Sequence, residues 1–182
     1  MSVFEHSFTL IGLVLGLTLT HVLSELVRIV RAKGLKSLGV LTPLLAVFVI
    51  LDVTTFWGIV WEMREELPSV WPVLGIGVVL CSLYYVSAAY VFPSADQDWL
   101  DLDTYYMQNR RMVLGIMLAC FSIVVIISGL NAGIFLRDPI SIAYLIILIL
   151  TIAVPWRWAS GIGLCALIGV DLLVFIPQFS GG

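Results

Sequence analysis

Two aspartates lie inside long apolar stretches of this 182-residue chain, where a carboxylate has little access to water. Asp52 belongs to a segment rich in Leu, Val and Phe, and Asp171 belongs to a similar segment near the C-terminus. An acid in the middle of a membrane costs about 2.5–3.5 kcal/mol on insertion scales and usually faces a cavity or a partner. The two residues are therefore candidates for a proton or cation path, or for an interface with another subunit. The alternative is a structural role, in which the acid is protonated or bonds a hydroxyl such as that of Thr54.

A second cluster of ionisable residues follows the first apolar stretch towards its basic end. His21 and Glu25 are four residues apart, and Glu25 and Arg28 are three apart, so all three lie on one helical face. A carboxylate and a guanidinium near the lipid headgroups can form a structural ion pair. The alternative is a role of Glu25 or His21 in proton or ion handling.

His6 and His21 also suggest a haem site. They are fifteen residues apart, about four helical turns, and so lie on similar faces near opposite membrane surfaces. Because one chain offers only one histidine at each level, ligation of haem b through two histidines requires a second copy, or a methionine as the other ligand. Haem b is the one cofactor that the sequence suggests.

Small residues recur every fourth position along the first apolar stretch, at Gly12, Gly16, Thr20 and Ser24. Such a strip allows close approach of another helix in a membrane. The other helix can belong to the same chain, which we favour from the sequence, or to another protein.

Composition defines the class of protein. Hydrophobic residues make up 61% of the chain and charged residues 12%, about half of the charged fraction typical of soluble domains. The chain has no GxSxG, HExxH, Walker or CxxC motif and no basic run typical of nucleic-acid binding. Cys81, Cys120 and Cys165 all lie in apolar runs and are expected to be core residues. We therefore expect a membrane protein that is not an enzyme and has no nucleic-acid partner.

The elements that position these residues are expected to form an all-α integral membrane fold, a six-transmembrane-helix bundle with a short cytoplasmic interfacial helix. The membrane-spanning helices are predicted at about 7–30, 38–61, 70–92, 112–135, 140–154 and 159–176, in one domain. Ser94 and Gln97 fit a capping box, which predicts the interfacial helix at about 96–110, turning into or merging with the fourth span. The fifth span is the shortest, and 140–174 is alternatively a re-entrant hairpin or one broken helix.

The cations are distributed unevenly over this topology. Seven of the nine fall on one side and only Arg64 and Arg137 on the other. The seven are Arg28, Arg31, Lys33, Lys36, Arg110, Arg111 and Arg157. By the positive-inside rule their side is cytoplasmic and both termini are outside, in the periplasm.

Depth along the helices predicts two polar layers. An outer layer contains His6, Asp52, Asn131 and Asp171. In the inner layer His21, Glu25 and Arg28 share their depth with residues of the third span, namely Tyr84, Tyr85, Ser87 and Tyr90. Arg110, Arg111, Trp99, Trp156 and Trp158 are expected to anchor the protein at the membrane interface.

The segment from Asp101 to Arg111 has the pattern D-x-x-x-Y-Y-x-x-x-R-R and enters an apolar span. Together with the stretch GLVLGLTLT that starts at Gly12, it resembles small uncharacterised inner-membrane proteins of bacteria. The resemblance implies a bacterial source and a multi-span fold, and it implies no activity or ligand.

The sequence therefore favours a polytopic inner-membrane protein that acts as a non-catalytic subunit or assembly partner of a membrane complex. Its partners are lipids and another membrane protein or its own copies. The first alternative is a small proton- or cation-coupled transporter or channel that uses Asp52, Asp171 and Glu25. The second is a haem-binding electron carrier that is a homo-oligomer and uses His6 and His21.

Overall fold

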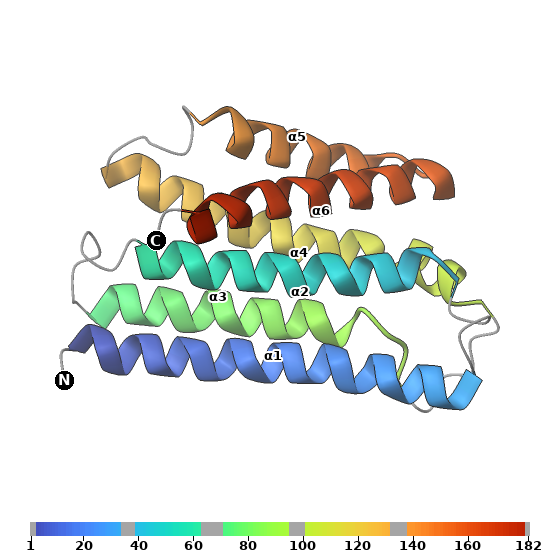
Figure 1. Ribbon diagram of the computed structural model, residues 1–182, viewed down its shortest axis with the longest axis horizontal. Helices are drawn as coiled ribbons and strands as arrows, with labels where there is room; N and C mark the ends of the chain where they lie inside the picture. Colours follow the sequence, from blue (N-terminus) through green and yellow to red (C-terminus); the bar gives the residue numbers. More distant parts are fainter. Residues whose placement is uncertain (1–2, 34–38, 63–70, 95–100, 132–137, 181–182) are drawn as a thin grey trace.

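The computed structural model describes residues 3–33, 39–62, 71–94, 101–131 and 138–180, and the regular structure within them is entirely helical (Figure 1). In the view of Figure 1 the six helices run roughly along the long axis of the structure. They are α1 (Val3–Lys33), α2 (Leu41–Glu62), α3 (Trp71–Ala89), α4 (Leu102–Asn131), α5 (Pro139–Ala153) and α6 (Arg157–Ser180).

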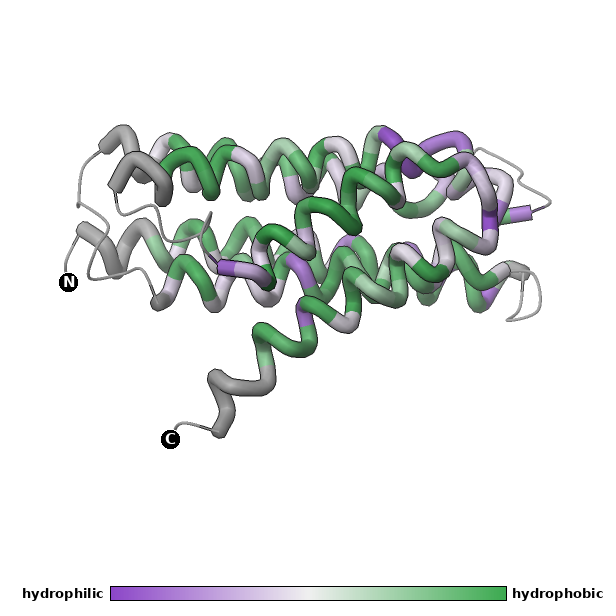
Figure 2. Tube along the Cα trace, turned by 90° about the horizontal axis from the view of Figure 1, so that it is seen from above, coloured by the Kyte–Doolittle hydropathy of each residue, from purple (hydrophilic) through white to green (hydrophobic). Residues whose placement is uncertain are grey.

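Helix α2 is the centre of the arrangement, because it packs against α1, α3, α4 and α6. Helix α1 also packs on α3, whereas α5 packs on α4 and α6. Figure 2 shows that α6 crosses the other helices obliquely. The core along α2 contains Leu45, Phe48 and Val49, all at most 1% exposed.

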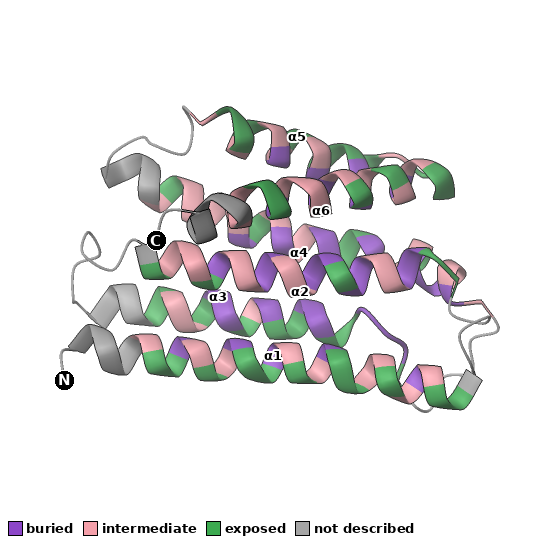
Figure 3. Cartoon of the chain, in the orientation of Figure 1, coloured by how far each residue is buried: buried purple, intermediate pink, exposed green. Residues whose placement is uncertain are grey.

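The helices expose apolar surface outward, as expected in lipid. On α1 the buried residues Ile11, Leu15 and Val22 recur at helical spacing and form one stripe, while Leu13 and Leu17 lie on the opposite, exposed face. Figure 3 shows buried and exposed stretches alternating along α1. A helix that is apolar all round is typical of a membrane environment.

In the part of the chain that the structure describes, four helices are long and apolar enough to cross a membrane: Phe8–Ala32, Leu41–Trp61, Leu102–Ile127 and Arg157–Phe175. The apolar helices Gly75–Ala89 and Pro139–Ala153 are shorter. Fifteen residues of α5 rise about 22 Å, less than the roughly 30 Å of a hydrocarbon core. The helical fold class is thus confirmed together with four potential spans.

One predicted boundary differs clearly. Residues 102–110 of the predicted interfacial helix belong to α4, which is continuous from Leu102 to Asn131, and residues 96–100 lie outside the described part of the chain. The described part of the predicted interfacial helix is thus continuous with the fourth span. The predicted capping pair of Ser94 and Gln97 includes a residue outside the described part of the chain, and α4 begins instead after Asp101. Asp101 accepts hydrogen bonds from the backbone N–H of Asp103 (3.0 Å) and from the Thr104 hydroxyl (2.6 Å).

The start of α5 follows from its first residues. The Asp138 carboxylate accepts hydrogen bonds from the backbone N–H groups of Ile140 (3.3 Å) and Ser141 (3.0 Å), and Pro139 occupies the first turn. Desolvation opposes ionisation of Asp138, but the hydrogen bonds from Ser141 and Ile140 outweigh it and lower the pKa of this carboxyl group.

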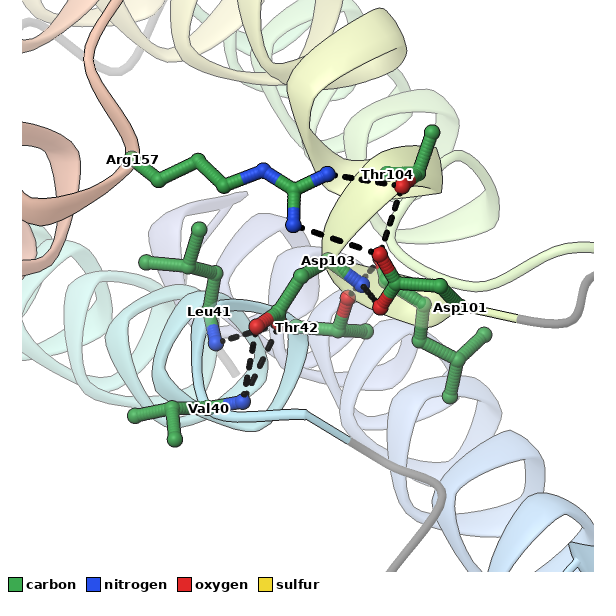
Figure 4. Close-up of polar contacts among 8 residues, drawn as sticks. Val40, Leu41, Thr42, Asp101, Asp103, Thr104 and Arg157 are labelled. Atoms are coloured by element: carbon green, nitrogen blue, oxygen red, sulfur yellow. Dashed lines mark hydrogen bonds and ion pairs between the residues drawn. The ribbon is translucent and has the colours of Figure 1, made fainter.

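Polar contacts join three helices at the end of the bundle where α2, α4 and α6 begin (Figure 4). Asp103 of α4 accepts hydrogen bonds from the backbone N–H groups of Val40 (3.0 Å) and Leu41 (2.9 Å), so it caps α2 from another helix. Arg157 of α6 lies 3.3 Å from the Asp101 carboxylate. We call this end the basic end, because it carries the cations of α1, α4 and α6: Arg28, Arg31, Arg110, Arg111 and Arg157.

Candidate functional site

Asp52 and Asp171 come together in the interior of the bundle. They belong to the packed helices α2 and α6, and their exposed fractions are 8% and 3%. Asp52 lies eleven residues from the start of α2, about 17 Å along its axis, and so is close to the middle of that helix. The two carboxyl groups are near enough to interact electrostatically.

Two tyrosines complete the surroundings of Asp52. The Tyr144 hydroxyl of α5 donates a hydrogen bond of 2.6 Å to Asp52 Oδ1. The Tyr84 hydroxyl of α3 also lies close to the Asp52 carboxyl group. Both rings are at most 5% exposed.

Cys120 of α4 is the fifth ionisable group at this place, because its thiol is within electrostatic range of Asp52. The helices α2, α3, α4, α5 and α6 thus each contribute one ionisable side chain. We call Asp52, Tyr84, Cys120, Tyr144 and Asp171 the acid–tyrosine site.

The hydrogen bonding of the acid–tyrosine site is incomplete. Asp52 Oδ2 and Asp171 Oδ2 are buried oxygen atoms that have no hydrogen-bond partner among the residues that the structure describes. Burying a carboxylate oxygen without a hydrogen-bond donor costs free energy, so the carboxyl group binds either a proton or a cation. Within the described part of the chain, the groups that act on these two acids are tyrosines and the other acid, and no cation is among them.

Two of the four members of the predicted outer layer come together, but near the middle of α2 rather than towards one end of the bundle. Asp52 and Asp171 meet, whereas the side chains of His6 and Asn131 lie outside the described part of the structure. The sequence reasoning missed Tyr144, and it assigned Tyr84 to the inner layer. Tyr144 had a signal: it is the one tyrosine in an otherwise aliphatic span, and a buried tyrosine hydroxyl usually finds a hydrogen-bond partner.

The inner cluster on α1 forms the expected ion pair. Arg28 binds Glu25 Oε2 through Nε (2.8 Å) and Nη2 (2.5 Å), and the same Nη2 donates a 2.6 Å hydrogen bond to the carbonyl of Pro93. The pair thus links α1 to the segment after α3. His21 packs its ring against Tyr85, with centroids 5.6 Å apart. These contacts fit the structural interpretation of the cluster.

Ser87 and Tyr90, the other expected inner residues, do not join the α1 cluster. Ser87 donates to the carbonyl of Val113 on α4 at 3.4 Å. The Tyr90 side chain is exposed, and its carbonyl accepts a hydrogen bond of 3.3 Å from the Tyr105 hydroxyl.

The expectation that Arg110 anchors the protein at the membrane interface is wrong, because this side chain does not point to the lipid headgroups. It is 2% exposed and donates hydrogen bonds to the Ser160 hydroxyl of α6 and to the carbonyl of Thr151 on α5 (3.3 Å for the latter). The side chain therefore joins three helices from inside the bundle. Arg111 is exposed, in agreement with a position at the surface.

The tryptophans near the start of α6 are exposed as an interface anchor requires. Trp156 and Trp158 are 60% and 65% exposed, and their rings stack with centroids 5.5 Å apart. Trp99, the third expected anchor, lies outside the described residues.

The haem hypothesis stays a prediction. Since the side chain of His6 is not described, the structure tests neither the depth of the two histidines nor a common ligand. Among the described residues, no group of three His, Cys, Asp or Glu side chains is arranged to hold a metal ion. Cys81 and Cys120 are buried, as expected, but Cys165 is exposed.

The small-residue strip of α1 lies on the outside of the bundle, contrary to the favoured expectation. Gly16, Thr20 and Ser24 are all exposed, and a β-carbon added to Gly16 would meet no atom within 4 Å. Gly12 is the exception, since an added β-carbon would lie 3.6 Å from the indole nitrogen of Trp57. Most of the strip is thus open to a helix from outside the chain.

No protein-family model, curated protein or solved structure matches this chain.

Proposed function

We propose that this protein is a multi-pass protein of a bacterial cytoplasmic membrane and acts as a non-catalytic subunit or assembly partner of a membrane complex. In this proposal all six helices cross or enter the bilayer, the basic end faces the cytoplasm, and both termini face the periplasm. The distribution of cations supports this orientation. The exposed tryptophan pair of Trp156 and Trp158 at the basic end supports a position there at the lipid interface.

The outward position of the small-residue strip carries the proposal. A helix face that meets only lipid is typically covered by large apolar side chains, whereas helix–helix contacts in membranes are enriched in Gly, Ser and Thr. On α1 the exposed residues Gly16, Thr20 and Ser24 lie between exposed leucines such as Leu13 and Leu17. This face therefore combines close approach of a partner helix with flanking apolar contacts.

Native mass spectrometry of the protein extracted gently from its own host membrane tests the proposal. We expect a stoichiometric second polypeptide or a second copy of the chain. Gly16→Leu should remove this partner without unfolding the chain, because Gly16 has free space around it. Gly75→Leu is the matched control, since Gly75 is also exposed and equally free but lies on α3.

Two results would contradict the subunit proposal. One is a monomer as the sole species in the wild type. The other is a partner that survives Gly16→Leu and Gly75→Leu equally, since the α1 strip would then not be the contact.

The acid–tyrosine site favours a second candidate, a small proton- or cation-coupled transporter or channel. Buried acids inside a membrane protein frequently mark ion or proton pathways. In liposomes, Asp52→Asn or Asp171→Asn should then abolish proton-linked flux while leaving expression intact. Unchanged flux in both variants would exclude this candidate.

A further inference from the structure

We propose that Asp52 and Asp171 together bind one exchangeable proton at neutral pH, with the proton on Asp171 and the negative charge on Asp52. The ligand of the acid–tyrosine site is thus a hydrogen ion. The inference does not depend on the role as a subunit, because such a proton can serve assembly or transport alike.

The burial of the two acids and their missing hydrogen-bond donors favour one bound proton. Both side chains are more than nine-tenths buried, and each has one oxygen atom without a hydrogen-bond donor. Two carboxylates in such surroundings repel each other and lose their hydration, so at most one of them is ionised at a time. One bound proton removes the repulsion and halves the buried charge.

Within the described ranges, the groups that face the pair from the neighbouring helices do not supply a positive charge. They are Tyr84 of α3, Cys120 of α4 and Tyr144 of α5. Tyrosine and cysteine have ordinary pKa values of about 10 and 8.5, so they are neutral at pH 7. The charge of the pair is therefore reduced by a proton on one of the two acids.

The hydrogen bond of Tyr144 decides which acid keeps the charge. A hydroxyl that donates to an ionised oxygen typically does so at about 2.5–2.7 Å, and such a bond is about twice as strong as a bond between neutral groups. The Tyr144 hydroxyl lies 2.6 Å from Asp52 Oδ1, within this range. Asp52 thus has a donor that stabilises its charge. Among the described residues, no such donor reaches Asp171 Oδ2.

Infrared spectroscopy of the protein in lipid bilayers at pH 7 tests the inference, because protonated carboxyl groups have a carbonyl band separate from carboxylates. The band is counted per chain with ¹³C-labelled aspartate and is identified by its shift in D₂O. We expect one protonated aspartate in the wild type and none in Asp171→Asn. Asp138→Asn is the matched control and should keep the band, because hydrogen bonds outside the apolar helices hold the Asp138 carboxyl ionised.

The wild-type count is informative even if a variant fails to fold. A count of zero would show that both acids are ionised, and a count of two would show that each holds its own proton; either overturns the proposal. A band that persists in Asp171→Asn would also overturn it. The spectra are first recorded with choline as the only buffer cation. Replacing choline by Na⁺ should leave the carbonyl band unchanged, and loss of the band would show that a metal cation occupies the site instead.

Discussion

Adding a methyl group at Gly39 is expected to destabilise the protein by about 2 kcal/mol, through two separable effects. Gly39 has a φ of +66°, in the left-handed region that costs other residues about 1 kcal/mol. The Asp103 carboxylate also occupies the space that the new β-carbon would fill. Gly39→Ala therefore both strains the backbone and displaces the side chain that caps α2.

The Asp103→Ala variant isolates the capping contribution. Asp103 accepts hydrogen bonds from Val40 and Leu41, and loss of a cap of this kind costs about 1 kcal/mol. Once Asp103 is removed, Gly39→Ala adds only the backbone strain. The double variant should then lose about 2 kcal/mol, and not the roughly 3 kcal/mol that is the sum of the single effects.

The free energies of unfolding can be measured in mixed micelles by SDS titration, followed by far-ultraviolet circular dichroism. Effects of independent sites usually add to within about 0.5 kcal/mol. If the double variant lost the full sum within that error, Asp103 would not lie against Gly39, and the cross-helix cap would be refuted.

Two further predictions concern helix contact and pH. Gly163→Ala should destabilise the bundle by about 1–3 kcal/mol, because the new β-carbon meets the Thr151 side chain of α5. Gly169→Ala on the same helix is the control and should be nearly neutral, because an added β-carbon there meets no atom within 4 Å. Equal unfolding midpoints of the two variants would contradict the α5–α6 contact. The hydrogen bond from the Thr104 hydroxyl lowers the pKa of Asp101 below its ordinary 3.8. The ionised carboxylate therefore stabilises the folded state above about pH 4. This contribution is lost as the pH falls through the lowered pKa. The unfolding temperature of the wild type should therefore fall more steeply below pH 4 than that of Asp101→Asn, and parallel curves would disprove the assignment.

Sequence reasoning predicted the helical class well, because apolar runs of about 20 residues directly indicate helices in lipid. It also predicted that Asp52 and Asp171 share a depth, since depth follows from residue count along a helix. The pairing with Tyr144 was not predictable in the same way. It depends on how each helix is rotated about its axis, and hydropathy does not determine that rotation.

Rotation also explains the two errors on α1 and α4. The strip of Gly16, Thr20 and Ser24 is compatible with an inner or an outer face, and the structure has it outside. Arg110 and Arg111 are adjacent and point in different directions from the helix, so only one of them faces outward. A pair of arginines near a predicted helix start does not reveal which one is buried.

The acid–tyrosine site brings side chains of five helices together, and the hydrogen bond between Tyr144 and Asp52 is its most direct contact. A double-mutant cycle with Asp52→Leu and Tyr144→Phe measures their coupling in the free energy of unfolding. Coupling of about 0.5–1.7 kcal/mol is expected for a hydrogen bond between membrane helices. A coupling of zero would show that α2 and α5 do not bring these two side chains together.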